Sequence, residues 1–570
     1  MKKTLGFITR NVSLIFLIIL LFVSSVLKIL EVSGHNFPFT TDQGRDMVDM
    51  RHMVATHTPR LVGPTTSING VLLGPFWYYF NLAPFIVGEG DPSYIVYWQI
   101  LWYQLSVVIL WFVLKKNHPS LALIVSVLLL LMPTGFNTAR YFWNANSMVF
   151  FTILYFAALI WALFPDSKVE NPKDVIPKNI SSLRTPPTAG CGNLYESSNF
   201  RLLILGLISG LAMQIEAAFG ILFFPFAFLY FVISSSLRRT VGWQSIKHIF
   251  KNSIPLIAGF GLTLLPQVLF ELKHGFIMTK ILLREFSGQG TMLGEKITFA
   301  EKVAQRWEHL QLLILRSTHL PPNYVPYLYL FALVIFLYVY IITKKSKSEA
   351  IKLWSLSFWF TLFATVFYLL FPQKLKEWYT LGLSIPLVLF FGCFLSYLWE
   401  RKSIIIKTLI VVLMGMAVYY SLKSQWDYTR DVAWKPSDDR SNMRNEIAAL
   451  DWVYQNAEGK GFKVYSYLPS VYDFPYNHLF WWYGNHKYGY EPLETAYLPG
   501  QPEYIRDVDK IWINKRDSGS QDLTFLIIEE DMDMPKRTEV WLGNFSKLCL
   551  LKEKIFPWHA SVRMLSACRR

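Results

Sequence analysis

Charged side chains are scarce in this chain: they make up 17% of its 570 residues, whereas hydrophobic residues make up 53%. This composition is typical of membrane proteins and excludes an ordinary soluble protein, because soluble packing does not hide so much apolar surface. Cysteine is scarce as well. The four cysteines show no CxxC or CxxH spacing, which excludes a zinc site and a disulfide framework. We expect Cys549 and Cys568 to be unpaired thiols, with a disulfide between them as the alternative.

The sequence has an excess of positive charge, with a formal net charge of +15 at pH 7. Such an excess can indicate a nucleic-acid partner. In a membrane protein, however, basic residues gather in cytoplasmic loops beside anionic lipid. We therefore expect membrane lipids, and no nucleic acid, to contact these residues.

Long apolar runs dominate the first 420 residues, and eleven of them are candidate membrane spans. A helix needs roughly 20 residues to cross the hydrocarbon core of a bilayer. The first run follows Lys2, Lys3 and Arg10 as in a signal peptide, but it is long and lacks a small-x-small cleavage site, so we interpret it as a retained span. The candidate spans are residues 12–30, 94–114, 121–133, 148–164, 202–213, 217–233, 254–270, 325–342, 353–371, 378–398 and 404–420.

One further apolar stretch, residues 71–87, contains Pro75, Asn81 and Pro84 and suits an interfacial helix as well as a span. The charge pattern decides between them. If the N-terminus is cytoplasmic and this stretch does not span, every short basic cluster falls on the cytoplasmic side, as the positive-inside rule requires. We therefore predict a multi-pass α-helical protein of the cytoplasmic membrane with about eleven spans.

This topology divides the chain into two parts. Residues 1–420 form the transmembrane region, with external loops at residues 31–93, which include the interfacial helix, and at residues 271–323. Residues 421–570 lie outside the cytoplasm, where charges, turns and short alternating runs replace the apolar stretches.

The C-terminal part reads as a soluble α/β domain. Helical spacing at residues 442–456 and strand-like runs at residues 462–468 and 523–528 indicate mixed secondary structure. Aromatic residues crowd residues 472–490, notably Phe480 to Tyr483. We interpret this cluster as a domain core or an interfacial belt rather than a platform that stacks on sugars.

Five short external loops of this topology carry polar residues that are unusual in a membrane protein. Asp42 and Asp46 are four residues apart and would share one face of a helix. Acids, cations and amides on one side of the membrane indicate a cavity that handles a charged headgroup. The loop residues are Asp42, Arg45 and Asp46, then Arg140, Asn144 and Asn146, then Gln214 and Glu216, then Glu271, Lys273 and His274, and last Lys374, Lys376, Glu377 and Tyr379.

These residues suit transfer from an anionic, lipid-linked donor. Such a donor needs cations or a metal to stabilise the developing phosphate charge, and Arg45, Arg140, Lys273 and Lys374 are the candidates. An acceptor hydroxyl or amine needs a base, for which we choose Asp42.

Four sequence elements carry a resemblance to a known family: the first-loop acid, the segment Gly-Pro-Phe-Trp-Tyr-Tyr-Phe-Asn-Leu, the element Phe-Glu-Leu-Lys-His-Gly-Phe and the late span Trp-Tyr-Thr-Leu-Gly-Leu-Ser-Ile-Pro. In these elements the chain resembles the GT-C superfamily, and it is most similar to the family 39-like group of bacterial protein O-mannosyltransferases and aminoarabinose transferases. The resemblance covers the membrane region and implies inverting transfer from a polyprenyl-phosphate sugar, with Asp42 as the first-loop catalytic acid.

The chain also departs from this family. Many relatives have an acid in the second external loop, where this sequence has Asn144 and Asn146, so a metal-binding carboxylate pair is in doubt. The cofactor stays open, with a divalent cation as the one considered. Glu216 stands where some related sequences have a histidine, and it either replaces that residue's function or compensates for the missing acid.

The sequence thus predicts an inverting glycosyltransferase that moves a sugar from a polyprenyl-phosphate donor to a glycan, lipid or protein acceptor on the outer face of the membrane. One alternative is a transporter or flippase for a lipid-linked saccharide, although transporters tend to show paired halves. Another is a non-catalytic receptor that acts through residues 421–570. The predicted site comprises Asp42 as catalytic residue, with Arg45, Asp46, Arg140, Asn144, Asn146, Glu216, His274, Lys374, Glu377 and Tyr379 as substrate-binding residues.

Overall fold

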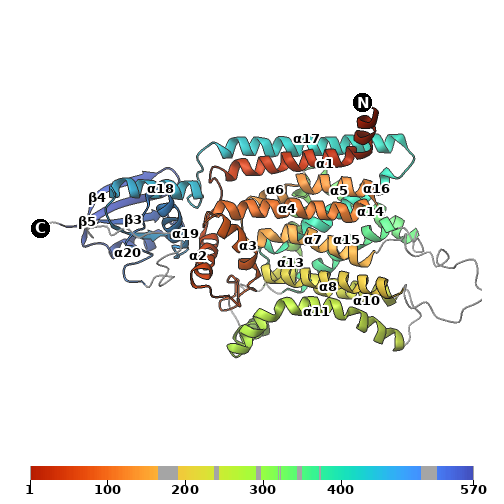
Figure 1. The fold of residues 1–570 in the computed structure, drawn as a ribbon, viewed down its shortest axis with the longest axis horizontal. Helices are drawn as coiled ribbons and strands as arrows, with labels where there is room; N and C mark the ends of the chain where they lie inside the picture. The colour runs from red at the N-terminus through yellow and green to blue at the C-terminus, as the bar shows by residue number, and fades with distance from the viewer. Residues whose placement is uncertain are drawn as a thin grey trace, which may run out of the picture.

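The computed structural model describes residues 2–164, 191–236, 243–289, 297–318, 320, 322–342, 349–371, 374–501 and 523–568. Most helices run along one direction in a bundle, and a small domain that holds the strands lies at one end of this bundle (Figure 1). The N-terminus lies towards the opposite end (Figure 1). This architecture confirms the predicted helical membrane region followed by an α/β domain.

The helical part of the chain contains the expected long apolar helices. Eight described helices are long and apolar enough to cross a membrane, and the bent pair α5 and α6 is a ninth candidate. The two remaining predicted spans fall on shorter apolar stretches. These are Asn199–Ile215, which is part of α8, and Ala217–Ile233, which covers α9 and most of α10. The elements are α1 Lys2–Val32, α2 Thr41–Thr56, α3 Phe76–Val87, α4 Pro92–Lys115, α5 Pro119–Leu131, α6 Pro133–Ala139, α7 Asn144–Leu163, α8 Cys191–Ile215, α9 Ala217–Gly220, α10 Phe223–Ser236, α11 Trp243–Lys273, α12 Ile277–Arg284, η2 Glu285–Gln289, α13 Phe299–Leu315, α14 Val325–Ile342, α15 Glu349–Leu370, η3 Glu377–Leu383, α16 Ser384–Trp399 and α17 Ile404–Ala433.

Within the stretch at residues 71–87, Phe76–Val87 forms the short helix α3. Its 12 residues give a length of about 18 Å, which is too short to cross a hydrocarbon core of about 30 Å. α3 lies beside α2 at the end of the bundle that faces the C-terminal domain (Figure 1). The structure thus shows a helix too short to be a span, and its place at the membrane interface stays a prediction.

The predicted span at residues 121–133 ends in a sharp bend. α5 and α6 are bent by 55° relative to each other. Pro133 causes the break, because it has no N–H to continue the helix and because Met132 before it takes an extended conformation. After the bend, α6 runs towards α1 and α17. At its end, Arg140 contacts Glu31 of α1 and Tyr428 of α17.

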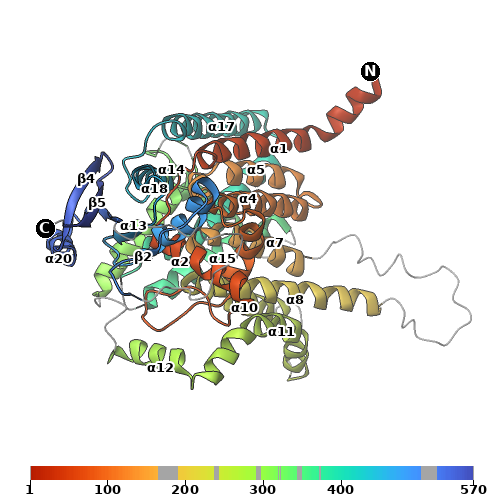
Figure 2. The same cartoon turned by 60° about the vertical axis from the view of Figure 1, so that its left-hand side comes forward.

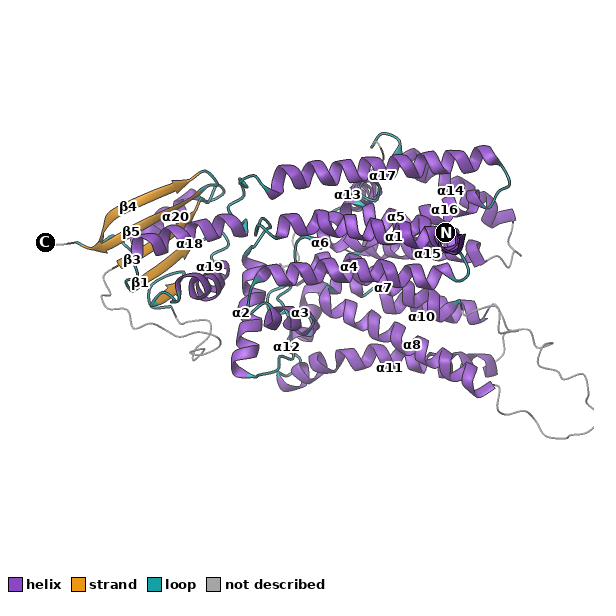
Figure 3. Cartoon of the chain, turned by 45° about the horizontal axis from the view of Figure 1, so that its top comes forward, coloured by secondary structure: helices purple, strands orange, loops and turns teal. Residues whose placement is uncertain are grey.

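In its described residues, the C-terminal domain forms one five-stranded sheet with helices packed against it (Figure 3). The strand order is β2-β1-β3-β5-β4; β1 is parallel to β2 and β3, whereas β5 is antiparallel to β3 and β4. The elements are α18 Met443–Ala457, β1 Phe462–Tyr467, α19 Phe474–Leu479, η4 Phe480–Tyr488, β2 Glu494–Ala496, β3 Leu523–Glu529, α20 Pro535–Gly543, β4 Leu548–Phe556 and β5 Ala560–Ala567.

Several features of this domain match the sequence predictions. The strands β1 and β3 and the helix α18 lie where they were expected. The aromatic cluster is buried: Phe480 packs against Phe462 in the domain core, whereas Trp481 stacks on Phe85 of α3. α17 continues past the apolar run to Ala433, so the proposed boundary at residue 420 falls inside this helix.

The prediction of unpaired thiols is wrong for Cys549 and Cys568, which form a disulfide. β4 and β5 form an antiparallel hairpin in which Cys549 lies opposite Ser566. The two cysteine Cα atoms are 5.0 Å apart, within the range that a disulfide requires. This pairing depends on the hairpin register, which the spacing of the cysteines does not reveal.

The C-terminal domain is attached to the start of α2. The backbone N–H of Met443 donates to the carbonyl of Phe37 at 2.9 Å, and the N–H of Phe39 donates to the carbonyl of Ser441 at 2.7 Å. The Thr41 hydroxyl lies 2.6 Å from the Ser470 hydroxyl. At this end of the molecule α2 lies close to the strand-containing domain, while α1 and α17 run side by side along the bundle (Figures 1 and 2). The contacts with the C-terminal domain therefore hold the N-terminal end of α2 in position.

Gly44 permits the close contact between α2 and α19. A Cβ at this position would lie 2.4 Å from the backbone nitrogen of Pro475. We expect Gly44→Ala to destabilise the protein by about 1–3 kcal/mol, the usual cost of overpacking. The measurement is thermal unfolding of the purified protein together with protease sensitivity of the C-terminal domain. The matched control is Gly415→Ala in α17, where an added Cβ meets nothing within 4 Å. Equal behaviour of the two variants would contradict this account of the interface.

Candidate active site

The candidate site is built on the first turn of α2. The backbone N–H and the hydroxyl of Thr40 both donate to the Gln43 side-chain oxygen, at 3.0 and 2.6 Å, which fixes where the helix begins. Asp42 falls in this first turn. A carboxylate is favoured there, because the N-terminal end of a helix carries partial positive charge.

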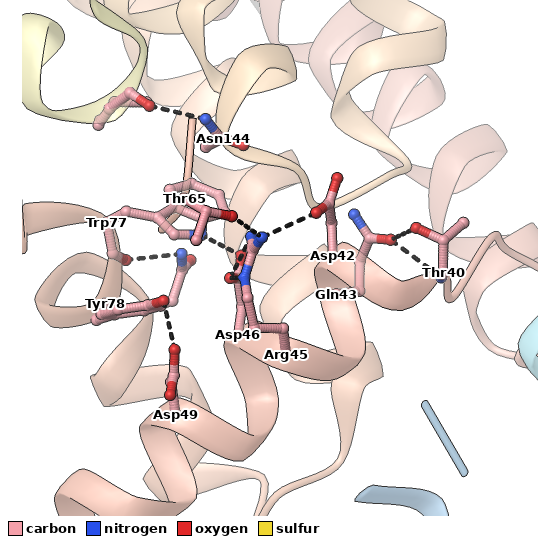
Figure 4. Close-up of polar contacts among 12 residues, drawn as sticks. Thr40, Asp42, Gln43, Arg45, Asp46, Asp49, Thr65, Trp77, Tyr78 and Asn144 are labelled. Carbon is pink, nitrogen blue, oxygen red and sulfur yellow. Dashed lines mark hydrogen bonds and ion pairs between the residues drawn. The ribbon is translucent and has the colours of Figure 1, made fainter. Parts of the chain in front are cut away.

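Arg45 joins the two acids of α2 (Figure 4). Its guanidinium contacts Asp42 at 2.9 Å and Asp46 at 2.8 Å, and it donates to the Thr65 hydroxyl at 2.9 Å. Asp46 also accepts a 2.7 Å hydrogen bond from the indole N–H of Trp77. The side chain of Asp46 is 1% exposed, whereas that of Asp42 is 44% exposed. Asp42 is thus the acid that a substrate can reach.

Burial is the main influence on the pKa of Asp46. Loss of water raises its pKa to about 6, although the Arg45 guanidinium and the Trp77 hydrogen bond oppose this rise. The same two carboxylates hold the pKa of Arg45 above its ordinary value, against the effect of burial. Asp46 and Arg45 are therefore both charged at neutral pH. Their ion pair holds the guanidinium of Arg45 next to the Asp42 carboxylate.

The loop between α6 and α7 forms the next part of the site. The Tyr141 hydroxyl donates to the Gln43 side-chain oxygen at 3.2 Å. Asn144 donates to the carbonyl of Ile215 at 2.9 Å and to the Glu216 carboxylate at 3.3 Å. Asn146 donates back to the carbonyl of Tyr141 at 3.1 Å, which holds the loop in shape. The loop therefore links α2 to the junction of α8 and α9.

Glu216 lies at that junction, between two apolar helices. Its carboxylate accepts from the N–H of Ala218 at 3.3 Å and caps α9. Burial raises the pKa of Glu216 to about 7, while the positive charge of Lys376 acts in the opposite direction. Glu216 therefore changes charge near neutral pH, and Lys376 lies close enough to feel that change.

The segment before and within η3 completes the site. Lys376 donates to the Ser67 hydroxyl at 2.9 Å, and the hydroxyls of Tyr379 and Ser67 are 3.1 Å apart. Ser67 belongs to the same loop as Thr65, which contacts Arg45. Hydrogen bonds, the electrostatic effect of Lys376 on Glu216 and the loop that carries Thr65 and Ser67 thus connect these residues back to α2. We call this set the polar rim; it consists of Asp42, Gln43, Arg45, Thr65, Ser67, Tyr141, Asn144, Glu216, Lys376 and Tyr379.

Comparisons with known proteins agree with this architecture. No protein-family model and no curated protein sequence matches the chain. The crystal structure of ArnT from Cupriavidus metallidurans bound to undecaprenyl phosphate matches it with a TM-score of 0.56 and 11% identity, over 98% of this chain and 98% of that chain. The chain has the ArnT fold.

Two further solved structures are similar. ArnT from the same organism in the apo state gives a TM-score of 0.55 with 11% identity, over 99% of this chain and 98% of that chain. The apo oligosaccharyltransferase of Archaeoglobus fulgidus gives 0.45 with 12% identity, over 78% of this chain and 58% of that chain. The match to ArnT confirms the predicted GT-C-like fold, and the chain is a multi-pass membrane protein.

Arg140 occupies a different place from the one expected for a phosphate ligand. Its side chain is 6% exposed and forms an ion pair with Glu31 of α1. The guanidinium also donates to the carbonyl of Phe136 at 3.0 Å and lies 4.4 Å from the ring centre of Tyr428. In this ArnT fold, Arg140 therefore faces the bundle interior, directly before the loop that carries Tyr141. The sequence does not show the inward direction, because it does not reveal that α1 supplies a buried acid there.

Three other predicted residues lie apart from the contacts of the polar rim. His274 is exposed at the end of α11, where its ring stacks on Phe270 at 4.1 Å between ring centres. Lys374 is exposed in the segment before η3. Glu377 pairs with Arg316 at 3.3 Å, and both side chains are about half exposed. Such surface groups contribute little to a preorganised site.

The structure also identifies functional candidates that the prediction did not choose. Lys376 belongs to the same loop as Lys374, and the sequence does not show which of the two lysines belongs to the site. Ser67, Thr65 and Tyr141 carry ordinary hydroxyls in loops, and no sequence signal distinguishes them. Among the described residues, no group of three His, Cys, Asp or Glu side chains is placed to share a metal ion, and Arg45 bridges the Asp42 and Asp46 carboxylates.

Trp77 supports the buried carboxylate of Asp46, and its removal provides a test. We expect Trp77→Phe to cost about 1–3 kcal/mol, because it leaves a buried acceptor without its donor. The measurement is the thermal midpoint of the purified protein. The matched control is Trp98→Phe, since the buried indole N–H of Trp98 has no hydrogen-bond partner within the described part of the chain. A loss no larger than that of the control would show that the Trp77 bond does not stabilise the site.

Proposed function

We propose that the chain is an inverting glycosyltransferase that moves a sugar from a polyprenyl-phosphate-linked donor to an acceptor hydroxyl or amine. The observation that carries this proposal is the exposed carboxylate of Asp42, held by Arg45 on a polar rim that also contains the cation Lys376. The ArnT structure whose fold the chain shares contains undecaprenyl phosphate, which supports a lipid-phosphate donor.

In the proposed reaction, Asp42 is the general base. The acceptor O–H or N–H gives its proton to Asp42 as the acceptor atom forms a bond to the anomeric carbon. The bond between that carbon and the phosphate oxygen breaks on the opposite side, and the phosphate leaves with the electron pair. Attack from the side opposite the leaving group inverts the anomeric centre. Arg45 keeps the Asp42 carboxylate in one position through its 2.9 Å contact.

The leaving phosphate needs positive charge and donors. Lys376 is exposed, and the Ser67 and Tyr379 hydroxyls lie beside it, so these three groups can bind phosphate oxygens. Lys374 lies two residues away and adds positive charge to the same segment. We assign Arg140 a positioning role: its buried pair with Glu31 fixes the start of the loop that carries Tyr141.

The proposed location is the cytoplasmic membrane, with a cytoplasmic N-terminus. In this orientation the polar rim and the C-terminal domain lie on the outer face, and the short basic clusters lie inside, in agreement with the positive-inside rule. The donor's headgroup would then reach the rim from the outer leaflet. The acceptor would approach from the side of the C-terminal domain, which contacts Thr41 next to Asp42 through Ser470.

Replacement of Asp42 tests the base. We expect Asp42→Asn to lower kcat by about 10²- to 10⁴-fold, the usual contribution of a general base, while donor binding changes little. The assay is sugar transfer from a defined polyprenyl-phosphate donor by purified protein. The matched control is Asp49→Asn on the same helix, whose carboxylate contacts Tyr78 and Arg60. Wild-type turnover by Asp42→Asn would remove Asp42 from its role as the base, whereas no sugar transfer by the wild-type protein would favour a binding or transport function.

The raised pKa of Glu216, about 7, predicts a pH dependence of donor binding. Above that pH the carboxylate is negative beside Lys376 and repels the donor phosphate; below it the neutral acid does not. We therefore expect the KM for donor to rise as pH increases from 6 to 8, by about three- to tenfold for a repulsion of about 0.7–1.4 kcal/mol.

Two variants define the Glu216 test. Glu216→Gln should flatten the dependence of KM on pH, because its amide carries no charge at any pH. Glu400→Gln, at the opposite end of the bundle, should keep the wild-type profile. A wild-type profile in Glu216→Gln would assign the titration to another group.

A further inference from the structure

A cavity of about 260 Å³ lies between helix ends on the side of the bundle away from the polar rim. Lys116 and His118 line it after α4 and before α5, Trp161 lines it near the end of α7, and Arg201 lines it from α8. α7 contains 20 residues, from the rim residue Asn144 to Leu163, so the two sites are about 30 Å apart along the helix. The cavity is thus separate from the site proposed for sugar transfer.

The cavity combines aromatic walls with positive charge. Phe112, Trp161 and Phe164 supply apolar surface, and Lys116 and Arg201 supply cations. No carboxylate is found among the described residues that line it. A small space whose described lining residues include cations and aromatic rings but no acid favours an anionic ligand with an apolar part.

The structure fixes the guanidinium of Arg201 at this cavity. One of its terminal nitrogens donates to the carbonyl of Trp161 at 3.2 Å, and the group lies 5.1 Å from the centre of the Trp161 ring. The hydrogen bond to Trp161 uses one edge of the planar guanidinium. An arginine held in this way can present its remaining N–H groups to a phosphate as a fork.

The N-terminus of α5 adds to the positive potential. α5 begins at Pro119 after His118, and no side chain caps its N-terminus by a hydrogen bond. His118 is itself a lining residue. The N-terminal end of this 13-residue helix carries partial positive charge, which favours an anion at this position in addition to the two side-chain cations.

The surface next to the cavity is apolar and faces outward. Phe112, which lines the cavity, is 62% exposed, and Phe200, next to Arg201, is 55% exposed. In a membrane protein, exposed aromatic side chains on spanning helices contact lipid, so a ligand in this cavity would have acyl chains as neighbours.

We infer that this cavity binds the phosphate group of an anionic phospholipid, with Arg201 and Lys116 as its cationic ligands and Phe112 and Phe200 beside its acyl chains. In the topology proposed above, the cavity opens to the cytoplasmic leaflet, which is rich in anionic lipid. This inference does not depend on sugar transfer, because it concerns the opposite end of the bundle.

Native mass spectrometry of the full-length protein in detergent tests this inference. The probes are phosphatidylglycerol and phosphatidylcholine with identical acyl chains, titrated after delipidation. We expect the first phosphatidylglycerol to bind at least about tenfold more tightly than phosphatidylcholine, and Arg201→Ala to remove that preference. Lys116→Ala should reduce it as well, and as an exposed residue it serves if Arg201→Ala does not fold.

The matched control is Lys115→Ala. Lys115 is a neighbouring cation whose ammonium lies 4.1 Å from the Trp111 ring centre and which does not line the cavity. It should keep the wild-type preference. Equal binding of the two lipids, or a full preference for phosphatidylglycerol in both Arg201→Ala and Lys116→Ala, would overturn the inference. Displacement of phosphatidylglycerol by millimolar inorganic phosphate would assign the cavity to a soluble phosphate and overturn the lipid assignment.

Discussion

The structure of the candidate site depends on one buried ion pair, between Arg45 and Asp46. A carboxylate that is 1% exposed is costly unless it has partners, and here a guanidinium and the indole N–H of Trp77 supply them. Arg45 and Asp46 both belong to α2 and Trp77 belongs to α3, so the hydrogen bond from Trp77 to Asp46 fixes the two helices relative to each other. The same guanidinium reaches outward to Asp42, so the buried pair determines where the exposed acid points.

The loops around this helix are held by similar means. Arg140 is paired with Glu31 inside the bundle, and the chain that follows it bonds to α2 through Tyr141 and to Glu216 through Asn144. The C-terminal domain contacts the residues directly before and within the first turn of α2. The loops that form the site are distant in sequence, but each is bonded to a helix. This suits a reaction that needs the reacting groups in fixed positions.

Much of this architecture follows from the sequence, because the bilayer imposes strong rules. Apolar runs of sufficient length had to be helices, and the proline-containing stretch at residues 71–87 contains the short helix α3. The spacing of Asp42 and Asp46 placed both on one side of α2. The alternating runs gave β1 and β3 in the C-terminal domain.

The remaining features depend on packing that no local pattern encodes. Arg140 looked like a free cation in a loop, but Glu31 reaches it from α1, more than 100 residues away in sequence. Lys376 and Lys374 are equivalent by composition, and only the fold places Ser67 beside Lys376. The disulfide between Cys549 and Cys568 depends in the same way on a hairpin register.

The central claim is that Asp42, Ser67 and Lys376 face one water-filled opening that binds the donor phosphate. The most direct measurement places single cysteines at these three positions, in a chain without its other reactive thiols, and labels intact cells with a membrane-impermeant thiol reagent. The account predicts that all three are labelled from outside the cell and that added polyprenyl phosphate protects all three. Labelling from opposite sides of the membrane, or labelling that polyprenyl phosphate does not change, would contradict it.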